Sequence, residues 1–252
     1  MAEPISIAPV TGLPLIKEGD DLSALILASL AQQDVTLIDG DVLVLAQKIV
    51  SKSEGRQVEL ASVKPSDKAL SLAKEVDKDP RIVELILSES EEVVRHTKGV
   101  LIVAHKLGFV HANAGIDQSN VEGNDTVLLL PKDSDKSARD LRNQIEAATD
   151  KTIGVVIADS FGRAWRKGTV GVAIGASGVD TLLDERGKQD LVGRDLEITE
   201  IGRADELAAA AGLAMGQAGE GIPVALVRGL KTVDAQEGVG KLLRAKNEDL
   251  FR

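Results

Sequence analysis

The stretch TIGVVIADSFGRAWRKGTVGVAIGASGV, residues 152–179, decides the predicted fold. An apolar run predicts a strand that ends at Asp159, a polar turn follows, and a Gly-rich apolar run predicts a second strand. Two strands without a helix between them favour a hairpin, whereas a doubly wound sheet needs strands and helices that alternate. The stretch therefore favours a mixed α+β fold with largely antiparallel sheets and packed helices.

The rest of the chain supports this fold class, because its predicted strands and helices do not alternate strictly. We expect helices over 22–31, 64–79, 79–97, 134–148 and 204–217, and strands over 5–10, 41–46, 56–63, 99–110, 126–131 and 223–229. Asp20 or Asp21, Ser66 and Asp79 are the expected N-caps, and Pro80 suits a first helical turn. A hairpin is expected around residues 106–108, and 184–194 is a charged loop. Residues 1–252 are expected to form a single unit, with room for two sub-domains.

Composition excludes several classes of protein. The net charge of −10 and the 2% aromatic content argue against binding to nucleic acid. The chain has no Cys and three His, which leaves little scope for a zinc site or a thiol nucleophile. We found no apolar run of membrane-spanning length and no signal peptide in residues 1–10, so we expect a cytoplasmic enzyme.

Polar side chains follow three apolar segments, and their oxygen atoms suit a hard cation. They are Asp117, the pair Asp159–Ser160, and Gln217. Carboxylate, hydroxyl and amide oxygens are preferred by Mg²⁺ and Mn²⁺. The plainer interpretation is that each Asp caps a turn or a following helix. Standard P-loop and Rossmann motifs are absent from the sequence.

Two groups of cations stand beside Gly-rich turns in this acidic chain. Lys48, Lys52 and Arg56 form one group, and Arg163, Arg166 and Lys167 form the other. They indicate either phosphate binding or solvated surface. Trp165 lies in the second group, and we expect it in the core or at an interface. With the metal-capable oxygens, these groups suggest a metal-dependent nucleotide enzyme.

Longer motifs give a more specific indication. The segments GLPLIKEGDDL, AQKIVSKSEGR, HANAGIDQSNV, LLLPKDSDKSAR, IADSFGRAWRKGTVGVAIGASGV and ADELAAAAGLAMGQAGEGIPVALVRG occur in this order between about Pro9 and Gly229. Together they resemble the coenzyme F420-0:L-glutamate ligase (gamma-glutamyl ligase) family. The resemblance implies an intertwined homodimer and a GTP-dependent ligase in coenzyme F420 biosynthesis. Such an enzyme joins L-glutamate to coenzyme F420-0, with Mg²⁺ or Mn²⁺ and with K⁺ as a possible further ion.

The resemblance also implies a set of site residues. The implied metal ligands are Asp117, Asp159, Ser160 and Gln217. The implied GTP contacts are Gly12, Leu13, Pro14, Leu15, Ile16, Gln47, Lys48, Lys52, Asn120, Met215, Gly216, Gln217, Ala218, Gly219, Glu220, Gly221 and Ile222. We assign catalytic roles to Lys52, Arg163 and Lys167, as holders of phosphate or of acidic substrates.

The expected chemistry is activation of a carboxylate by the GTP γ-phosphoryl group, giving an acyl phosphate that the glutamate amine attacks. GDP and phosphate are then released. Two alternatives stay open: another metal-dependent carboxylate–amine ligase or phosphotransferase on the same scaffold, and a non-catalytic nucleotide-binding module. The motifs leave open the number of glutamates added, whether a dehydro form of the precursor is used, and whether the chain is part of a fusion with a flavin-binding reductase domain. They assign no role to His111.

Overall fold

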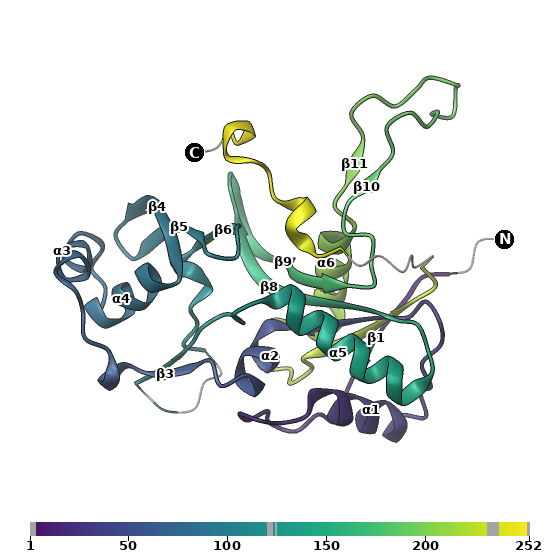
Figure 1. Ribbon diagram of the computed structural model, residues 1–252, viewed down its shortest axis with the longest axis horizontal. Coiled ribbons are helices and arrows are strands. Elements are labelled where there is room, and N and C mark those ends of the chain that lie inside the picture. Colours follow the sequence, from purple (N-terminus) through teal and green to yellow (C-terminus); the bar gives the residue numbers. More distant parts are fainter. Residues whose placement is uncertain (1–3, 120–122, 124, 231–236, 251–252) are drawn as a thin grey trace.

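A five-stranded sheet forms the centre of the computed structural model, which describes residues 4–119, 123, 125–230 and 237–250 (Figure 1). Its strands, in spatial order, are β1 (Ser6–Val10), β12 (Val224–Arg228), β2 (Val42–Ala46), β8 (Gly154–Arg163) and β9 (Arg166–Ser177). Strands β2 and β8 run parallel, and the other neighbours are antiparallel. The expected mixed, largely antiparallel fold is therefore confirmed.

Helices cover both faces of this sheet. Helices α1 (Leu22–Gln32) and α5 (Ser134–Thr149) pack on one face, and α6 (Arg203–Met215) packs on the other. Successive strand residues point to opposite faces, so Leu43 joins the core under α1 and α5, whereas Val44 joins the core under α6. Each fully buried side chain of this kind stabilises the fold by roughly 1.5–3 kcal/mol. Asp21 caps α1 by accepting a hydrogen bond from the Ala24 amide.

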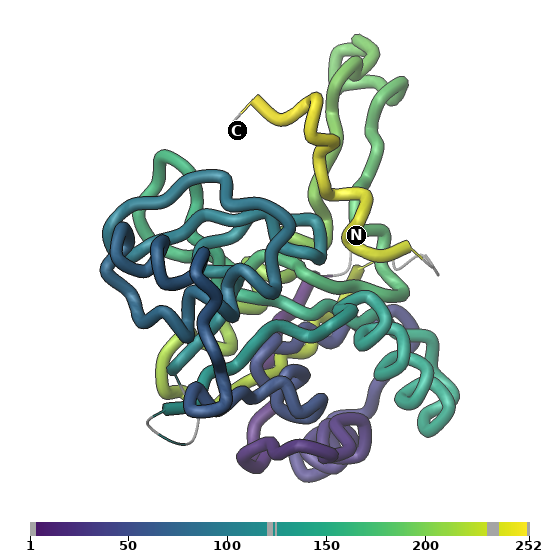
Figure 2. The backbone as a smooth tube through the Cα atoms, turned by 60° about the vertical axis from the view of Figure 1, so that its left-hand side comes forward, coloured from purple at the N-terminus to yellow at the C-terminus, as the bar shows by residue number. Residues whose placement is uncertain are grey.

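A lobe packs beside the central sheet and has a hydrophobic core of its own (Figure 2). Its elements are α3 (Asp67–Val76), α4 (Pro80–Ser88), β4 (Ser90–Thr97), β5 (Val100–His105) and β6 (Val110–Ala112). The short pair β3 (Gln57–Glu59) and β7 (Thr126–Leu128) joins the chain that enters the lobe to the chain that leaves it. Helix α2 (Gln47–Ser53) links β2 to β3. Strand β6 contacts β8, so the lobe packs against the central sheet at this strand.

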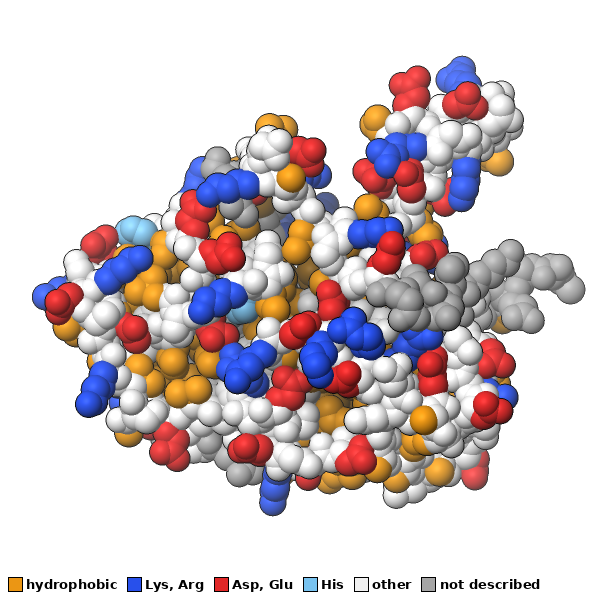
Figure 3. Space-filling model, viewed as in Figure 1, with side chains coloured by type: hydrophobic (Ala, Val, Ile, Leu, Met, Phe, Trp, Pro, Cys, Tyr) orange, Lys and Arg blue, Asp and Glu red, His pale blue; other side chains and the backbone are white. Residues whose placement is uncertain are grey.

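An arm projects from the body (Figures 1 and 3). Its base is the pair β10 (Leu183–Asp184) and β11 (Glu200–Ile201), and charged side chains of both signs cover it. Single 3-10 turns cover Leu60–Ser62, Asn113–Gly115, Val239–Leu242 and Lys246–Glu248. In the described part of the chain, each helix is too short or too polar to cross a membrane.

Two expectations about single elements are wrong. The helix expected over 79–97 ends at Ser88, and residues 90–97 form β4. Val93, Val94 and Thr97 are β-branched and favour a strand, and pairing with β5 supplies the backbone hydrogen bonds. Strand β8 also continues to Arg163 instead of ending at Asp159, because β9 pairs with it along that whole length.

Candidate active site

A cavity of about 690 Å³ opens where β2 gives way to α2. Ala46, the last residue of β2, pairs with Ala158 of β8. Beyond that point β8 continues while β2 has left the sheet, so Asp159 and Ser160 border the cavity instead of a neighbouring strand. The predicted residues that line this site cavity are Leu13, Pro14, Leu15, Ile16, Gln47, Lys48, Lys52, Asp159, Ser160, Met215, Gly216, Gln217, Ala218, Gly219, Glu220, Gly221 and Ile222. The structure thus brings together four segments that are distant in the sequence.

Helix α2 supplies Gln47 to the cavity wall. The Gln47 side chain is 1% exposed, and its Oε1 accepts a hydrogen bond from Ser51 Oγ at 2.8 Å. Its Nε2 is buried and has no hydrogen-bond partner among the described residues. A buried donor without an acceptor costs about 1–3 kcal/mol. A ligand with acceptor oxygens would remove that cost.

The loop after α6 forms the opposite wall. Gly216 ends the helix with φ +70°, and a Cβ there would overlap the Glu220 side chain. Glu220 accepts a hydrogen bond from the Ala218 amide at 2.8 Å, which holds the loop in a tight turn. Gln217 Oε1 accepts a hydrogen bond from Thr169 Oγ1 of β9 at 2.8 Å. The loop is therefore shaped by its own contacts and presents backbone groups to the cavity.

The side chain of Asp159 contacts the imidazole of His111, which belongs to β6. His111 Nε2 lies 3.1 Å from Asp159 Oδ2, and the two side chains are 9% and 13% exposed. The other ring nitrogen, Nδ1, lies 2.8 Å from the Ala112 carbonyl oxygen. Both neighbours are acceptor oxygens, so the tautomer of the ring decides which of the two contacts is a hydrogen bond donated by His111. Phe161 packs edge-on against the same ring at 3.9 Å between centroids.

Asp117 stands next to the cavity but does not line it. Its Oδ2 lies 2.6 Å from Lys48 Nζ, and its Oδ1 accepts a hydrogen bond from the Ser119 amide at 2.6 Å. Burial alone would raise the pKa of the Asp117 carboxyl, but the bonds from Lys48 and Ser119 outweigh it and lower this pKa. Lys48 lines the cavity, so Asp117 contacts the cavity wall through this lysine. That Asp117 binds a metal ion stays a prediction.

Several predicted site residues lie elsewhere. Gly12 is outside the cavity lining, and Asn120 lies outside the described residues. Arg163 and Lys167 are exposed at the tip of the β8–β9 hairpin. Trp165 at that tip is 87% exposed, so it lies outside the core of the chain, and the other half of that expectation, an interface, stays a prediction. In the turn, the backbone of Trp165 has a φ of +62°.

The donor set fits a hard divalent cation. A carboxylate from Asp159, a hydroxyl from Ser160 and an amide oxygen from Gln217 line one cavity, and all are oxygen ligands. No cluster of three His, Cys, Asp or Glu side chains occurs in the part of the chain that the structure describes. A cation here would therefore take neutral oxygens beside Asp159, with substrate oxygens or water to complete its shell.

Comparison with known proteins decides the family. Residues 12–229 match the model of the F420-0:gamma-glutamyl ligase family. The chain belongs to the F420-0:gamma-glutamyl ligase family. The matched residues include every part of the site cavity.

Curated members of this family align with almost the whole chain. A protein named coenzyme F420:L-glutamate ligase from Methanothermobacter thermautotrophicus is 44% identical, covering 98% of this chain and 99% of its own. One of the same name from Archaeoglobus fulgidus is 46% identical, covering 98% and 96%. One from Methanosarcina mazei is 37% identical, covering 96% and 93%. The resemblance inferred from the motifs is therefore confirmed.

The sequence motifs missed some residues of the gamma-glutamyl ligase cavity. His111 had no role, although its imidazole contacts Asp159. Gly171 of β9 also lines the cavity, and a Cβ there would overlap the Ala208 carbonyl of α6. The strand register of the hairpin could have indicated Gly171. This residue pairs with Ser160, so the two lie at the same level of the sheet. His111 gave no comparable signal, because its contact crosses from one sheet to another.

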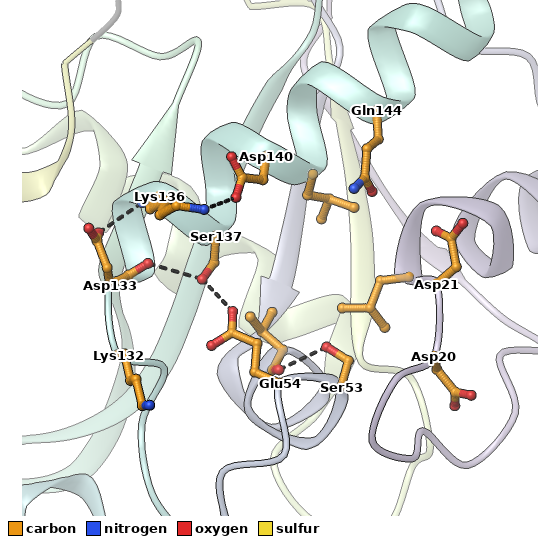
Figure 4. A pocket seen from close by; sticks show the side chains of 13 residues that line it. Asp20, Asp21, Ser53, Glu54, Lys132, Asp133, Lys136, Ser137, Asp140 and Gln144 are labelled. Carbon is orange, nitrogen blue, oxygen red and sulfur yellow. Dashed lines mark hydrogen bonds and ion pairs between the residues drawn. The ribbon is translucent and has the colours of Figure 1, made fainter.

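A second cavity, of about 490 Å³, lies between α5, the end of α2 and the start of α1 (Figure 4). We call it the acidic cavity. Its carboxylates are Asp20, Asp21, Glu54, Asp133 and Asp140. Each already accepts a hydrogen bond or an ion pair from a neighbouring protein group: the amides of Lys17, Ala24 and Lys136, the Ser137 hydroxyl, and the Lys136 ammonium. This cavity therefore has no unsatisfied carboxylate that calls for a ligand.

Proposed function

We propose that this chain is a GTP-dependent ligase that joins L-glutamate to coenzyme F420-0 through an acyl phosphate. The observation that carries the proposal is the site cavity itself, where the implied GTP loops and the oxygen donors Asp159, Ser160 and Gln217 surround one space. Its volume of about 690 Å³ is in the range of small-molecule sites, roughly 300–1,000 Å³. The family match and the names of its curated members support the ligation of L-glutamate.

The reaction needs activation because a carboxylate has oxide as its leaving group. A carboxylate oxygen of the acceptor forms a bond to the γ-phosphorus, and the bond from that phosphorus to the β–γ bridging oxygen breaks. GDP leaves. The glutamate nitrogen then attacks the acyl carbon, phosphate departs with the electron pair of the C–O bond, and the nitrogen loses a proton. The result is an amide, GDP and phosphate, with atoms and charges balanced.

The residues of this chain bind and orient the reactants. Lys48 and Lys52 line the cavity and would counter phosphate charge, and the buried Gln47 Nε2 would donate to an acceptor oxygen of the nucleotide. A bound Mg²⁺ or Mn²⁺ would supply positive charge to the phosphate oxygens. Asp159, Ser160 and Gln217 would hold it, and Asp117 would tune the site through Lys48. K⁺ is proposed as a possible further ion.

Mass spectrometry of the products tests the function. The protein is incubated with GTP, L-glutamate, coenzyme F420-0 and Mn²⁺, and we expect one or more glutamate additions with one GDP released per addition. The number of additions gives the product length, and a dehydro precursor run in parallel identifies the preferred acceptor. GDP release with a different acceptor or amine would indicate another ligase or phosphotransferase. GTP binding without GDP release in any mixture would indicate a nucleotide-binding module.

We also propose that two copies of the chain form an intertwined dimer through the arm. Leu191, Val192 and Ile198 of the arm are 106%, 74% and 87% exposed, which is costly for apolar side chains in water. Burial against a second copy would remove that cost. Light scattering should give a mass twice that of one chain. The double variant Leu191→Asp with Val192→Asp should give the mass of a single chain. A monomer at all concentrations of the unchanged chain contradicts the proposal.

A further inference from the structure

The tip of the β8–β9 hairpin combines an exposed aromatic ring with three cations. Trp165, the only tryptophan of the chain, is 87% exposed. Arg163, Arg166 and Lys167 beside it are exposed as well. The inner residues of both strands are buried in the central sheet, so this chemistry is confined to the part of the hairpin that leaves the body.

The backbone at Trp165 adopts a conformation that turns usually place at Gly, Asn or Asp. Its φ of +62° lies in the left-handed region, which favours Gly, Asn and Asp and disfavours a bulky side chain. A solvent-exposed indole adds a further cost, because its large apolar surface remains in water. Both costs would be offset where a ligand covers the ring. Strain of this kind is found mainly at functional sites.

None of the three cations at the tip forms an ion pair with a described residue. Across the described ranges, no carboxylate lies within 4.0 Å of the charged nitrogens of Arg163, Arg166 or Lys167, and the Arg163 guanidinium donates to the Lys167 carbonyl at 3.3 Å. By contrast, Lys48, Arg56 and Arg228 are all ion-paired. In a chain of net charge −10, this local positive charge favours an anionic partner.

The tip is continuous with the site cavity. Asp159 and Ser160 line the cavity from the same strand that ends at Arg163. A strand advances about 3.3 Å per residue, so Arg163 lies about 10 Å beyond Ser160. A molecule that reacts beside Ser160 and extends for about this distance along the strand would reach Trp165.

We propose that the hairpin tip binds the aromatic end of the acceptor substrate. Trp165 stacks on the flat deazaflavin ring, and Arg163, Arg166 and Lys167 hold its acidic side arm, whose carboxylate enters the site cavity. Stacking by an aromatic side chain and attraction between cations and an anionic arm are the interactions that this set of residues provides. The inference rests on the proposed function, since that function names the acceptor.

The single tryptophan provides a direct test. Coenzyme F420-0 is titrated into the full chain without GTP, and we expect saturable quenching of the Trp165 fluorescence. Added salt should weaken the binding, because the acidic side arm of the substrate is held by charge. A deazaflavin ring without the acidic arm should bind about tenfold more weakly or worse, which corresponds to the loss of charge-assisted contacts.

Steady-state kinetics tests the same site by substitution. Trp165→Ala should raise KM for coenzyme F420-0 about tenfold, with kcat and KM for GTP nearly unchanged, and Trp165→Phe should restore most of the loss. Arg166→Gln with Lys167→Gln should raise the same KM and reduce its dependence on salt. Matched controls are Leu70→Ala and Lys68→Gln on α3, which remove an exposed apolar and an exposed cationic side chain far from the hairpin.

The outcomes separate this inference from the proposed function. Unchanged KM and absent quenching in an active enzyme overturn the inference and leave the function intact. A Trp165→Ala variant that falls apart into smaller assemblies in sedimentation also overturns it, because the ring would then belong to a subunit contact. Saturable quenching without any glutamate addition supports the binding site and contradicts the proposed reaction.

Discussion

The site cavity and the acidic cavity have similar sizes but opposite chemistry. In the acidic cavity, each carboxylate is satisfied by a neighbouring amide, hydroxyl or ammonium group. In the site cavity, the buried Nε2 of Gln47 has no partner among the described residues. The two cavities therefore differ in that one has a buried polar side chain without a partner in its wall, a group that a bound ligand could satisfy.

The largest expected effect concerns Asp159, the carboxylate proposed to hold the metal ion in the site cavity. Asp159→Asn should lower kcat/KM for glutamate addition by on the order of 10³-fold, because the cation loses its charged ligand. Mn²⁺ titration monitored by electron paramagnetic resonance should show weaker binding by the same variant. His111→Gln keeps a donor toward Asp159 and should lose much less of both. Full activity and Mn²⁺ affinity in Asp159→Asn would remove this residue from the site.

Acid should destabilise the fold through His105, a buried residue of β5. Burial first, and then the nearby charges, lower the pKa of His105 from the ordinary 6.5 to about 4. Because the unfolded chain binds this proton at higher pH than the folded one, stability is fully present above about pH 6.5 and is lost as the pH falls toward 4. The loss should be about 3 kcal/mol.

The control for this effect is His105→Gln, which can still accept the hydrogen bond from the Leu107 amide. Urea unfolding at about pH 7 and about pH 4 should show a smaller loss of unfolding free energy in His105→Gln than in the unchanged chain. Equal losses in the two proteins would show that other groups govern the acid sensitivity.

Close backbone packing is the next expected difference between the cavities. Gly171→Ala should lower the unfolding free energy by about 1–3 kcal/mol, because its Cβ would overlap the Ala208 carbonyl of α6. Gly162→Ala is the matched control in the same hairpin, since nothing lies within 4 Å of its added Cβ. Thermal unfolding compares the two variants. Equal stability would mean that α6 can move away from β9 at little cost.

The smallest expected effect concerns the acidic cavity. Asp140→Asn removes an exposed ion pair with Lys136 one helical turn away, and solvent screens such a pair, so the stability should hardly change. Glutamate addition should stay within about twofold of the unchanged enzyme. A large loss of activity would break the comparison, since it would give the acidic cavity a part in the reaction.

Much of the fold was predictable because local patterns determine it. The caps Asp21, Ser66 and Asp79 occur where expected, and the stretch from residue 152 to residue 179 forms the expected hairpin. Strand β4 was missed because its first half, Ser90 to Glu92, is polar and continues the pattern of α4. Only tertiary pairing with β5 decides between helix and strand there.

The candidate site was predictable from motifs but not from spacing. The family motifs named most residues of the cavity, yet periodicity alone left Asp159 as an ordinary cap at a strand end. The structure gives it a different setting, inside β8 at the level where β2 departs. His111 depends on a contact between separate sheets, which a single sequence does not reveal.

The order of strands in the central sheet has a consequence for synthesis of the protein. Strand β12, the last of the chain, lies between β1 and β2, the first two. A growing polypeptide therefore holds β1 without its neighbour until residues 224–228 leave the ribosome, and domains emerge at only about 5–20 residues per second. The loop that ends at Pro223 is anchored by the same strand. Chains that still lack residues 224–228 therefore lack a finished site cavity.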